Sequence, residues 1–254
     1  MLFFEELGGG PPLLFLHGFL GSGTNWRQIS KHFSERYTCI LPDLRNHGWS
    51  FHNNDCSYLA MAEDVCELIR HYHLNECIII GHSMGGKIAM SVMSMIPEYI
   101  KAGIIVDIAP KAYAAIHAPI LDAMCNLSLS NVSSLSELDL DLSREIPDPE
   151  LRRFLLKNLV KDNEKYVWKI NLEALRKHSH VISALPPISE GIDIPVLVIK
   201  AGNSSYIKDP EDRYLFERYF DQTWFEIIPG AGHWVHASHP REFLSCVDHF
   251  INES

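Results

Sequence analysis

Residues 77–86 read Cys-Ile-Ile-Ile-Gly-His-Ser-Met-Gly-Gly, and this stretch decides the fold. The apolar run 77–80 has the length of a buried strand, and the small, apolar residues 85–95 are typical of a buried helix. Between them, residues 81–85 match the pattern Gly-x-Ser-x-Gly. A sharp strand-turn-helix of this kind strains the serine backbone and exposes its hydroxyl at the edge of a sheet. The stretch therefore predicts a nucleophile, Ser83, at the end of a buried strand.

Short apolar runs alternate with amphipathic stretches on both sides of this turn. The runs predict strands at 13–16, 37–41, 77–80, 103–106, 195–199 and 224–228. The stretches predict helices at 26–33, 58–72, 85–95, 206–220 and 240–251. Strands without apolar-polar alternation are buried on both faces, so the pattern predicts an α/β fold with a mostly parallel sheet flanked by helices.

The alternation of strands and helices stops between residues 111 and 190. We find helical patterns there and predict no strand: an apolar face at 151–159, a helix at 166–175, and a loop or short helix at 126–144. We expect residues 1–110 and 191–254 to form one α/β core, and 111–190 to form a helical cap. The cap would cover the carboxyl edge of the sheet, where open α/β sheets bind ligands.

Composition narrows the classes of function. The 254 residues carry a formal net charge of −10 and no long run of Lys or Arg, so we expect no nucleic-acid partner. No apolar stretch is long enough to span a membrane, and the N-terminus does not read as a signal peptide. The six cysteines are scattered, as expected for reduced thiols, and the protein is expected to be cytoplasmic. The sequence does not predict the oligomeric state.

A serine nucleophile needs a positioned base, and His233 is the predicted one. It follows the last predicted strand through the glycine-rich turn 229–232, as expected where the chain order of the catalytic residues is Ser, Asp or Glu, then His. His236 and His239 are rivals, and the three histidines together could be imagined as a metal cluster. Since no acidic residue or Cys completes a zinc-binding spacing, no metal is expected.

The acid that orients the histidine is predicted to be Asp107. The loop after the strand 195–199, where this acid often lies, has no carboxylate before Asp209. Asp107 ends the strand after the nucleophile strand, at the same edge of the sheet, and can reach the same histidine. Asp209 is the alternative candidate for this acid. Asn203, Ser204 and Ser205 remain alternative hydrogen-bond partners of the acid or the histidine.

The oxyanion of the tetrahedral intermediate needs backbone N–H donors. One predicted donor is the amide of Met84, the residue after the nucleophile, and the other is the amide of Phe19. Phe19 lies in the segment His17-Gly18-Phe19-Leu20-Gly21, directly after the strand 13–16. Gly18 allows a close backbone approach, and His17 is interpreted as a residue that braces this loop.

Six motifs carry a family resemblance: LHGFLGS (16–22), LPDLRNHGWS (41–50), GHSMGGKIAM (81–90), VDIAP (106–110), AGNSSYI (201–207) and GAGHWVHASHP (230–240). Together they resemble the YbfF-type bacterial esterases and their mitochondrial relatives in the α/β-hydrolase superfamily. The resemblance implies an α/β-hydrolase fold and an acid at Asp107. It also implies that residues 43–48 brace the oxyanion loop. Members of the group cleave small acyl esters, and some are linked to thioesters such as acyl-CoA.

These observations predict a serine esterase that acts on a small acyl ester or thioester through an acyl-enzyme on Ser83, without a cofactor. A C–C bond hydrolase or a cofactor-free haloperoxidase would use the same residues and remains an alternative. A ligand-binding module with weak catalysis on the same scaffold is a third hypothesis, since fold alone does not establish function. The sequence does not predict the acyl length or the leaving group.

Overall fold

The computed structural model describes residues 1–130 and 132–253, and its centre is a seven-stranded sheet. In spatial order the strands are β1 (Phe4–Gly8), β3 (Thr38–Pro42), β2 (Pro12–Leu16), β4 (Cys77–His82), β5 (Ile100–Val106), β8 (Val196–Ala201) and β9 (Thr223–Ile228). β1 is antiparallel to β3, and the other pairings in this sheet are parallel. The predicted mostly parallel α/β sheet is confirmed.

The edge strand β1 was not predicted from the sequence. Its sequence, Phe-Glu-Glu-Leu-Gly, contains two charged residues, and none of the five is fully buried, so it forms no apolar run. A strand at the edge of a sheet pairs on one side only and does not need to be apolar on both faces. Charged residues on such an edge also discourage pairing with another chain.

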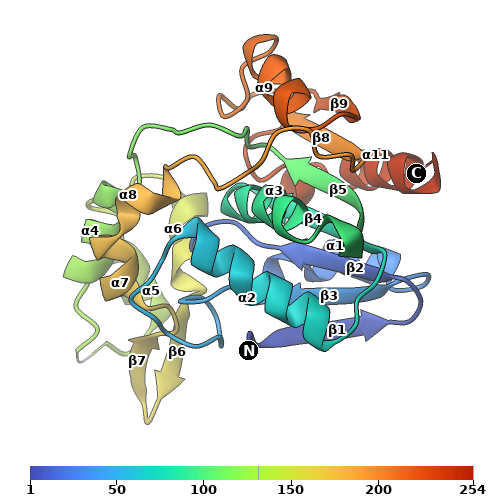
Figure 1. Ribbon diagram of the computed structural model, residues 1–254. Helices are drawn as coiled ribbons and strands as arrows, with labels where there is room; N and C mark the ends of the chain where they lie inside the picture. The colour runs from blue at the N-terminus through green and yellow to red at the C-terminus, as the bar shows by residue number, and fades with distance from the viewer. Residues whose placement is uncertain (131, 254) are drawn as a thin grey trace.

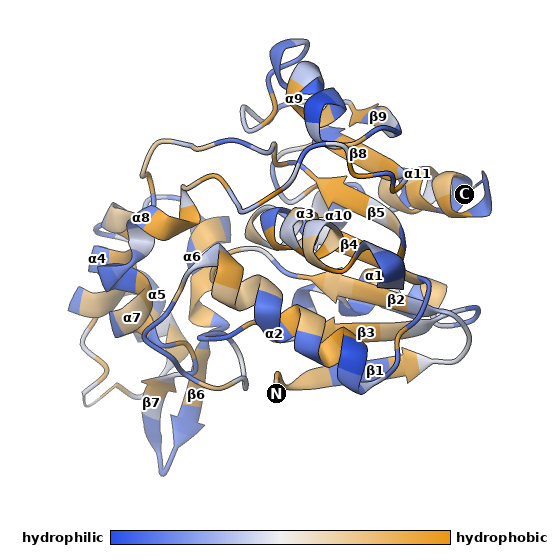
Figure 2. Cartoon of the chain, in the orientation of Figure 1, coloured by the Kyte–Doolittle hydropathy of each residue, from blue (hydrophilic) through white to orange (hydrophobic). Residues whose placement is uncertain are grey.

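Helices cover both faces of the sheet and build two cores. α2 (Tyr58–His71), α3 (Met84–Met95) and α9 (Glu211–Tyr219) pack on one face. α1 (Arg27–Phe33) and α11 (Pro240–Glu253) pack on the other (Figure 1). Ile79 belongs to the first core, whereas Ile78 and Ile80 belong to the second, because successive strand residues point to opposite faces. The central strands are accordingly apolar along their length (Figure 2).

Short helices complete the core: η1 (Gly23–Trp26), η2 (Pro97–Tyr99) and α10 (Val235–Ser238). The predicted helix at 206–220 is shorter than expected, since α9 begins only at Glu211. The reason is Pro210, which disfavours a helical conformation at Asp209 before it. Within the described part of the chain, no helix combines the length and the apolar character needed to cross a membrane.

Residues between β5 and β8 form a separate group of elements beyond the carboxyl ends of the parallel strands (Figure 1). They are α4 (Ala118–Asn126), α5 (Leu135–Leu142), α6 (Pro149–Leu156), β6 (Leu159–Asp162), β7 (Lys165–Trp168), α7 (Leu172–Lys177) and α8 (Ser179–Ile182). The predicted loop or short helix at 126–144 contains α5, and residue 131 within it lies outside the described residues.

The hairpin of β6 and β7 corrects the prediction that this segment holds no strand and that a helix spans 166–175. The two strands pair antiparallel with Asp162 opposite Lys165, so Asn163 and Glu164 form a two-residue turn. Both turn residues have positive φ, 46° and 67°. Such turns usually carry glycine at the second position. Glu164 occupies that position here, so the sequence lacks the residue that would predict a hairpin turn. The helix α7 begins only at Leu172.

Candidate active site

Ser83 sits in the strained turn between β4 and α3. Its backbone has φ 52° and ψ −118°, a conformation that non-glycine residues rarely adopt. The turn is tight enough to exclude side chains on both sides: a Cβ on Gly81 would lie 2.3 Å from the Gly85 oxygen, and one on Gly85 would lie 2.4 Å from the Leu16 oxygen. The Ser83 amide donates to the Val106 oxygen on the next strand at 3.0 Å, which anchors the turn to β5.

Asp107 and His233 meet at the same edge of the sheet. Asp107 directly follows β5 and is fully buried, and His233 Nδ1–H donates to its Oδ2 at 2.8 Å. The other carboxylate oxygen accepts from the Ala201 amide at 3.1 Å. The imidazole itself is partly open, with 21% of its side chain exposed. Asp107, which was predicted as the acid because the loop after β8 lacks a carboxylate, therefore does bind the predicted histidine, His233.

Three of the four alternative partners make other hydrogen bonds, and the fourth, Ser205, lines a smaller pocket with Ser83. Asp209 binds Arg213 at the surface, with 2.7 Å between the guanidinium Nε and the carboxylate. Asn203 donates to the Gly230 oxygen, and the Ser204 hydroxyl accepts from the Tyr206 amide. In the described chain none of these three side chains bonds to Asp107 or His233.

Tyr206 is a site residue that the sequence analysis missed. Its ring stacks on the His233 imidazole with 4.1 Å between centroids and 19° between planes. Nothing in its local sequence singles it out, because the stack joins two loops that are adjacent only in the folded sheet. The flat contact restricts rotation of the imidazole while leaving its Nε2 edge free.

Ser83 and His233 line one pocket of about 920 Å³ in front of the sheet edge. Across residues 1–130 and 132–253, no hydrogen bond joins the Ser83 hydroxyl to His233. Catalytic hydrogen bonds of this kind are often long in free enzymes and shorten when substrate binds. Phe19 and the cap residues Leu151 and Phe154 line the same pocket.

The two predicted oxyanion donors lie next to this site. Phe19 lines the pocket that holds His233, and Met84 begins α3 directly after Ser83. Among the residues that the structure describes, neither amide N–H has a hydrogen-bond acceptor. Both amides are thus available to a developing negative charge, and that of Met84 also lies at a helix N-terminus, which favours such a charge.

Two buried histidines brace the loop that carries Phe19. His47 Nδ1–H donates to the Arg45 oxygen at 2.9 Å, so its Nε2 is free to accept from the Leu20 amide at 3.2 Å. His17 Nε2 accepts from the Leu44 amide at 3.0 Å. Burial lowers the pKa of His17 to about 4 and that of His47 to about 3. Both rings are therefore neutral near pH 7, which is the state that can accept these bonds.

The predicted cap, residues 111–190, contacts the same loop through Asn158. This buried side chain donates to the Leu20 oxygen at 2.9 Å, so Leu20 is held at its amide by His47 and at its carbonyl by Asn158. Leu20 has φ 59°, a left-handed conformation that these bonds help to maintain. The sequence analysis did not identify Asn158, which lies in the segment with the weakest motifs.

The rival histidines have other surroundings. His236 is buried and stacks on Trp26 with 4.3 Å between ring centroids, and burial lowers its pKa to about 3. His239 accepts or donates a hydrogen bond at the surface with Ser238. His82, also buried, donates from Nε2 to the His233 backbone oxygen at 2.9 Å. In the described part of the chain, no group of three or more His, Cys, Asp or Glu residues is arranged to hold a metal ion.

Comparisons with known proteins agree with this geometry. Residues 11–240 match the family described as alpha/beta hydrolase fold. Esterase YbfF of Escherichia coli is 30% identical over 95% of this chain and 93% of its own length. The sn-1-specific diacylglycerol lipase ABHD11 of Xenopus laevis is 33% identical over 96% of this chain and 81% of its own. A solved structure of a marine microorganism esterase has a TM-score of 0.94 and 39% identity, with 98% of each chain covered.

Proposed function

This chain belongs to the α/β-hydrolase fold family and is a carboxylic ester hydrolase, and we propose that it acts as a serine esterase through an acyl-enzyme on Ser83. One observation carries the proposal: buried Asp107 binds His233 Nδ1, and His233 shares a pocket with the strained Ser83. A carboxylate that orients a histidine beside a serine is the arrangement that acyl transfer uses. The proposed substrates are small-molecule acyl esters or thioesters.

In the first half of the proposed reaction, the Ser83 hydroxyl oxygen attacks the substrate carbonyl carbon. His233 Nε2 takes the hydroxyl proton, because the bond from Nδ1–H to Asp107 leaves the lone pair on Nε2. The bond from the carbonyl carbon to the leaving oxygen or sulfur then breaks, and His233 returns the proton to the leaving group. A water molecule attacks the acyl-enzyme in the second half, again with His233 as base, and releases the acid and free Ser83.

Negative charge on the carbonyl oxygen is proposed to be stabilised by the amides of Phe19 and Met84. The support is that both N–H groups lack an acceptor within the described residues, that Met84 directly follows Ser83, and that Phe19 lines a pocket with Ser83. Removing one donor of this type typically slows a reaction about 10²–10³-fold. The neutral His47 that holds Leu20 would keep the Phe19 amide in place.

Residues 111–190 are proposed to act as a cap on the active site. Side chains from α6 and from the segment before α4 line the pocket that contains Ser83, among them Phe154 and His117. A cover of this kind excludes bulk water and shapes the space for the substrate.

The test compares Ser83→Ala with Ser91→Ala, a buried serine two turns further along α3. We expect Ser83→Ala to lose at least about 10⁴-fold in kcat for p-nitrophenyl esters and to lose labelling by a fluorophosphonate probe. Ser91→Ala, which controls for the loss of a hydroxyl on the same helix, should keep both. The proposal fails if purified, folded Ser83→Ala still hydrolyses esters at the wild-type rate.

A further inference from the structure

Two cavities of very different size open onto Ser83. The larger, about 920 Å³, is the pocket that His233 and Phe19 line. The smaller, about 150 Å³, is lined by Ser83 and Met84 together with side chains from both ends of the cap. His117 and Tyr206 line both cavities and thus stand between them. His233 is not among the described residues that line the smaller one.

The position of His233 assigns the two halves of the substrate. When the acyl-enzyme forms, the leaving oxygen or sulfur must receive a proton from His233, so the leaving group has to lie on the His233 side. The acyl group stays bonded to Ser83 and needs space that the leaving group and the attacking water do not occupy. We infer that the acyl group binds in the small cavity and the leaving group in the large one. This inference rests on the proposed function.

The volume of the small cavity limits the acyl group. The small cavity has a volume of about 150 Å³, and a cavity of this volume can hold one benzene molecule, which has the bulk of a six-carbon group. The small cavity therefore fits acyl groups of up to about six carbons. The substrate class is an ester or thioester with a short acyl group and a larger leaving group.

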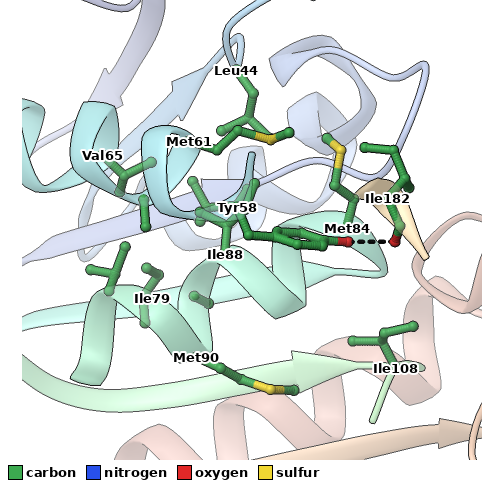
Figure 3. Close-up of a cluster of buried hydrophobic side chains, with 14 of the residues drawn as sticks. Leu44, Tyr58, Met61, Val65, Ile79, Met84, Ile88, Met90, Ile108 and Ile182 are labelled. Atoms are coloured by element: carbon green, nitrogen blue, oxygen red, sulfur yellow. Dashed lines mark hydrogen bonds between the residues drawn. The ribbon is translucent and has the colours of Figure 1, made fainter. Parts of the chain in front are cut away.

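The walls of the small cavity are tied together by hydrogen bonds and cannot widen easily. The Tyr58 hydroxyl donates to the Ile182 oxygen at 2.8 Å, a bond drawn as a dashed line in Figure 3, and Met84 and Ile108 line the same cavity. The Tyr113 hydroxyl donates to the Tyr206 oxygen, also at 2.8 Å. These bonds join α2, the two ends of the cap and the loop after β8.

The buried amino group of Lys87 contacts the same walls from behind. Lys87 lies one turn after Ser83 on α3, and its Nζ is 4.8 Å from the centre of the Tyr113 ring and 5.3 Å from that of Tyr58. Nζ also donates to the Ala184 oxygen at the end of the cap. When Lys87 is protonated, these are cation-π contacts, which strengthen when the cation is desolvated and help to hold the two tyrosine rings.

The large cavity has both polar walls, with Arg27 and Lys157, and apolar ones. It is wide, and α6 contributes Leu151, Phe154 and Leu155 to its lining. Phe154 packs against Trp234 with 5.5 Å between ring centroids, which adds an aromatic surface next to His233. These side chains suit a bulky, apolar alcohol or the apolar part of a thiol.

Two isomeric esters test the assignment. Octyl butyrate and butyl octanoate have the same composition and hydrophobicity, and differ only in which side of the ester is long. Since a methylene that does not fit a pocket costs about tenfold or more, we expect kcat/KM for octyl butyrate to exceed that for butyl octanoate by at least about tenfold. Equal values, or a preference for butyl octanoate, would overturn the inference.

A pair of variants locates the effect. Ile182→Ala enlarges the small cavity and should reduce the preference for butyl butyrate over butyl octanoate by about tenfold. Leu151→Ala enlarges the large cavity and should leave this acyl preference within about twofold. An acyl preference that moves with Leu151 and not with Ile182 would reverse the assignment.

Failure of the inference is separable from failure of the proposed function. An enzyme that labels at Ser83 and hydrolyses esters, but prefers the long acyl isomer, has the proposed mechanism with the opposite orientation of substrate. Loss of the Ser83 label removes the proposed function itself. The comparison of the two isomers uses the unmodified protein, so it holds even if Ile182→Ala fails to fold.

Discussion

Asp107→Asn tests the acid of the proposed site with the least disturbance of the fold. Both oxygens of Asp107 accept an N–H: Oδ2 from His233 at 2.8 Å, and Oδ1 from the Ala201 amide at 3.1 Å. The side chain is fully buried, so water cannot replace a lost partner. Asn has the same shape and also tolerates the φ of 49° found here.

The two possible orientations of the Asn amide set the size of the effect. With its oxygen toward His233, its NH2 group faces the Ala201 amide, and both buried donors are left without an acceptor, which costs at least about 1–3 kcal/mol. With its oxygen toward Ala201, every bond is kept only if His233 carries its proton on Nε2, where it cannot act as a base. The inactive orientation is thus favoured about 10- to 100-fold. Since the amide also lacks the charge that stabilises the imidazolium, kcat/KM should fall about 10³–10⁴-fold in all.

The assay is kcat/KM for p-nitrophenyl butyrate, with urea unfolding measured on the same samples. The free energy of unfolding of Asp107→Asn should lie within about 1 kcal/mol of that of the unmodified protein, because in the inactive orientation the Asn side chain keeps a hydrogen-bond partner on both sides. Asp209→Asn is the matched control, since that carboxylate binds Arg213 at the surface. A folded Asp107→Asn protein that keeps more than about a tenth of the original kcat/KM would refute the reasoning. Inactivation by Asp209→Asn would instead indicate that Asp209 is the acid.

Two further predictions follow from buried side chains. Asn158→Ala should lower kcat about tenfold with little change in KM, and weaken binding of a trifluoromethyl ketone equally, because Leu20 loses a bond that holds the oxyanion loop. Asn171→Ala, another cap asparagine bonded to the core, should change neither by more than about twofold. Burial lowers the pKa of Lys87 from 10.5 to about 7. Between pH 7 and pH 10.5 the folded protein therefore binds fewer protons than the unfolded chain, so its stability rises with pH. The free energy of unfolding, measured relative to Lys87→Met, should therefore increase from pH 7 to pH 10; no increase would contradict the lowered pKa of Lys87.

The turn at Ser83 could be predicted from sequence because its causes are local. A buried strand, two glycines and a small-residue helix occupy adjacent positions, and the tightness that demands Gly81 and Gly85 comes from the same few residues. The parallel sheet could be predicted for a similar reason, since fully buried strands need continuous apolar runs.

The hairpin in the cap and the edge strand β1 could not be predicted in the same way. The hairpin depends on left-handed backbone at Asn163 and Glu164, and Glu is an unusual residue for the second of these positions. β1 depends on the exposed edge of a sheet that exists only after β3 has formed. In both cases the neighbouring strand, and not the local residues, supplies the stabilising partner.

The sequence by itself determined that this chain carries a serine on a strand-to-helix turn and a histidine after the last strand of a parallel sheet. The tertiary structure decided which carboxylate meets that histidine, since Asp107 and His233 are 126 positions apart and Asp209 is nearer in the chain. It also decided that His17 and His47 are neutral braces and that two cavities of unequal size open onto Ser83. The physical reason is that a turn is set by the sterics of adjacent residues. Burial, proton affinity and cavity shape instead depend on side chains that only folding brings together.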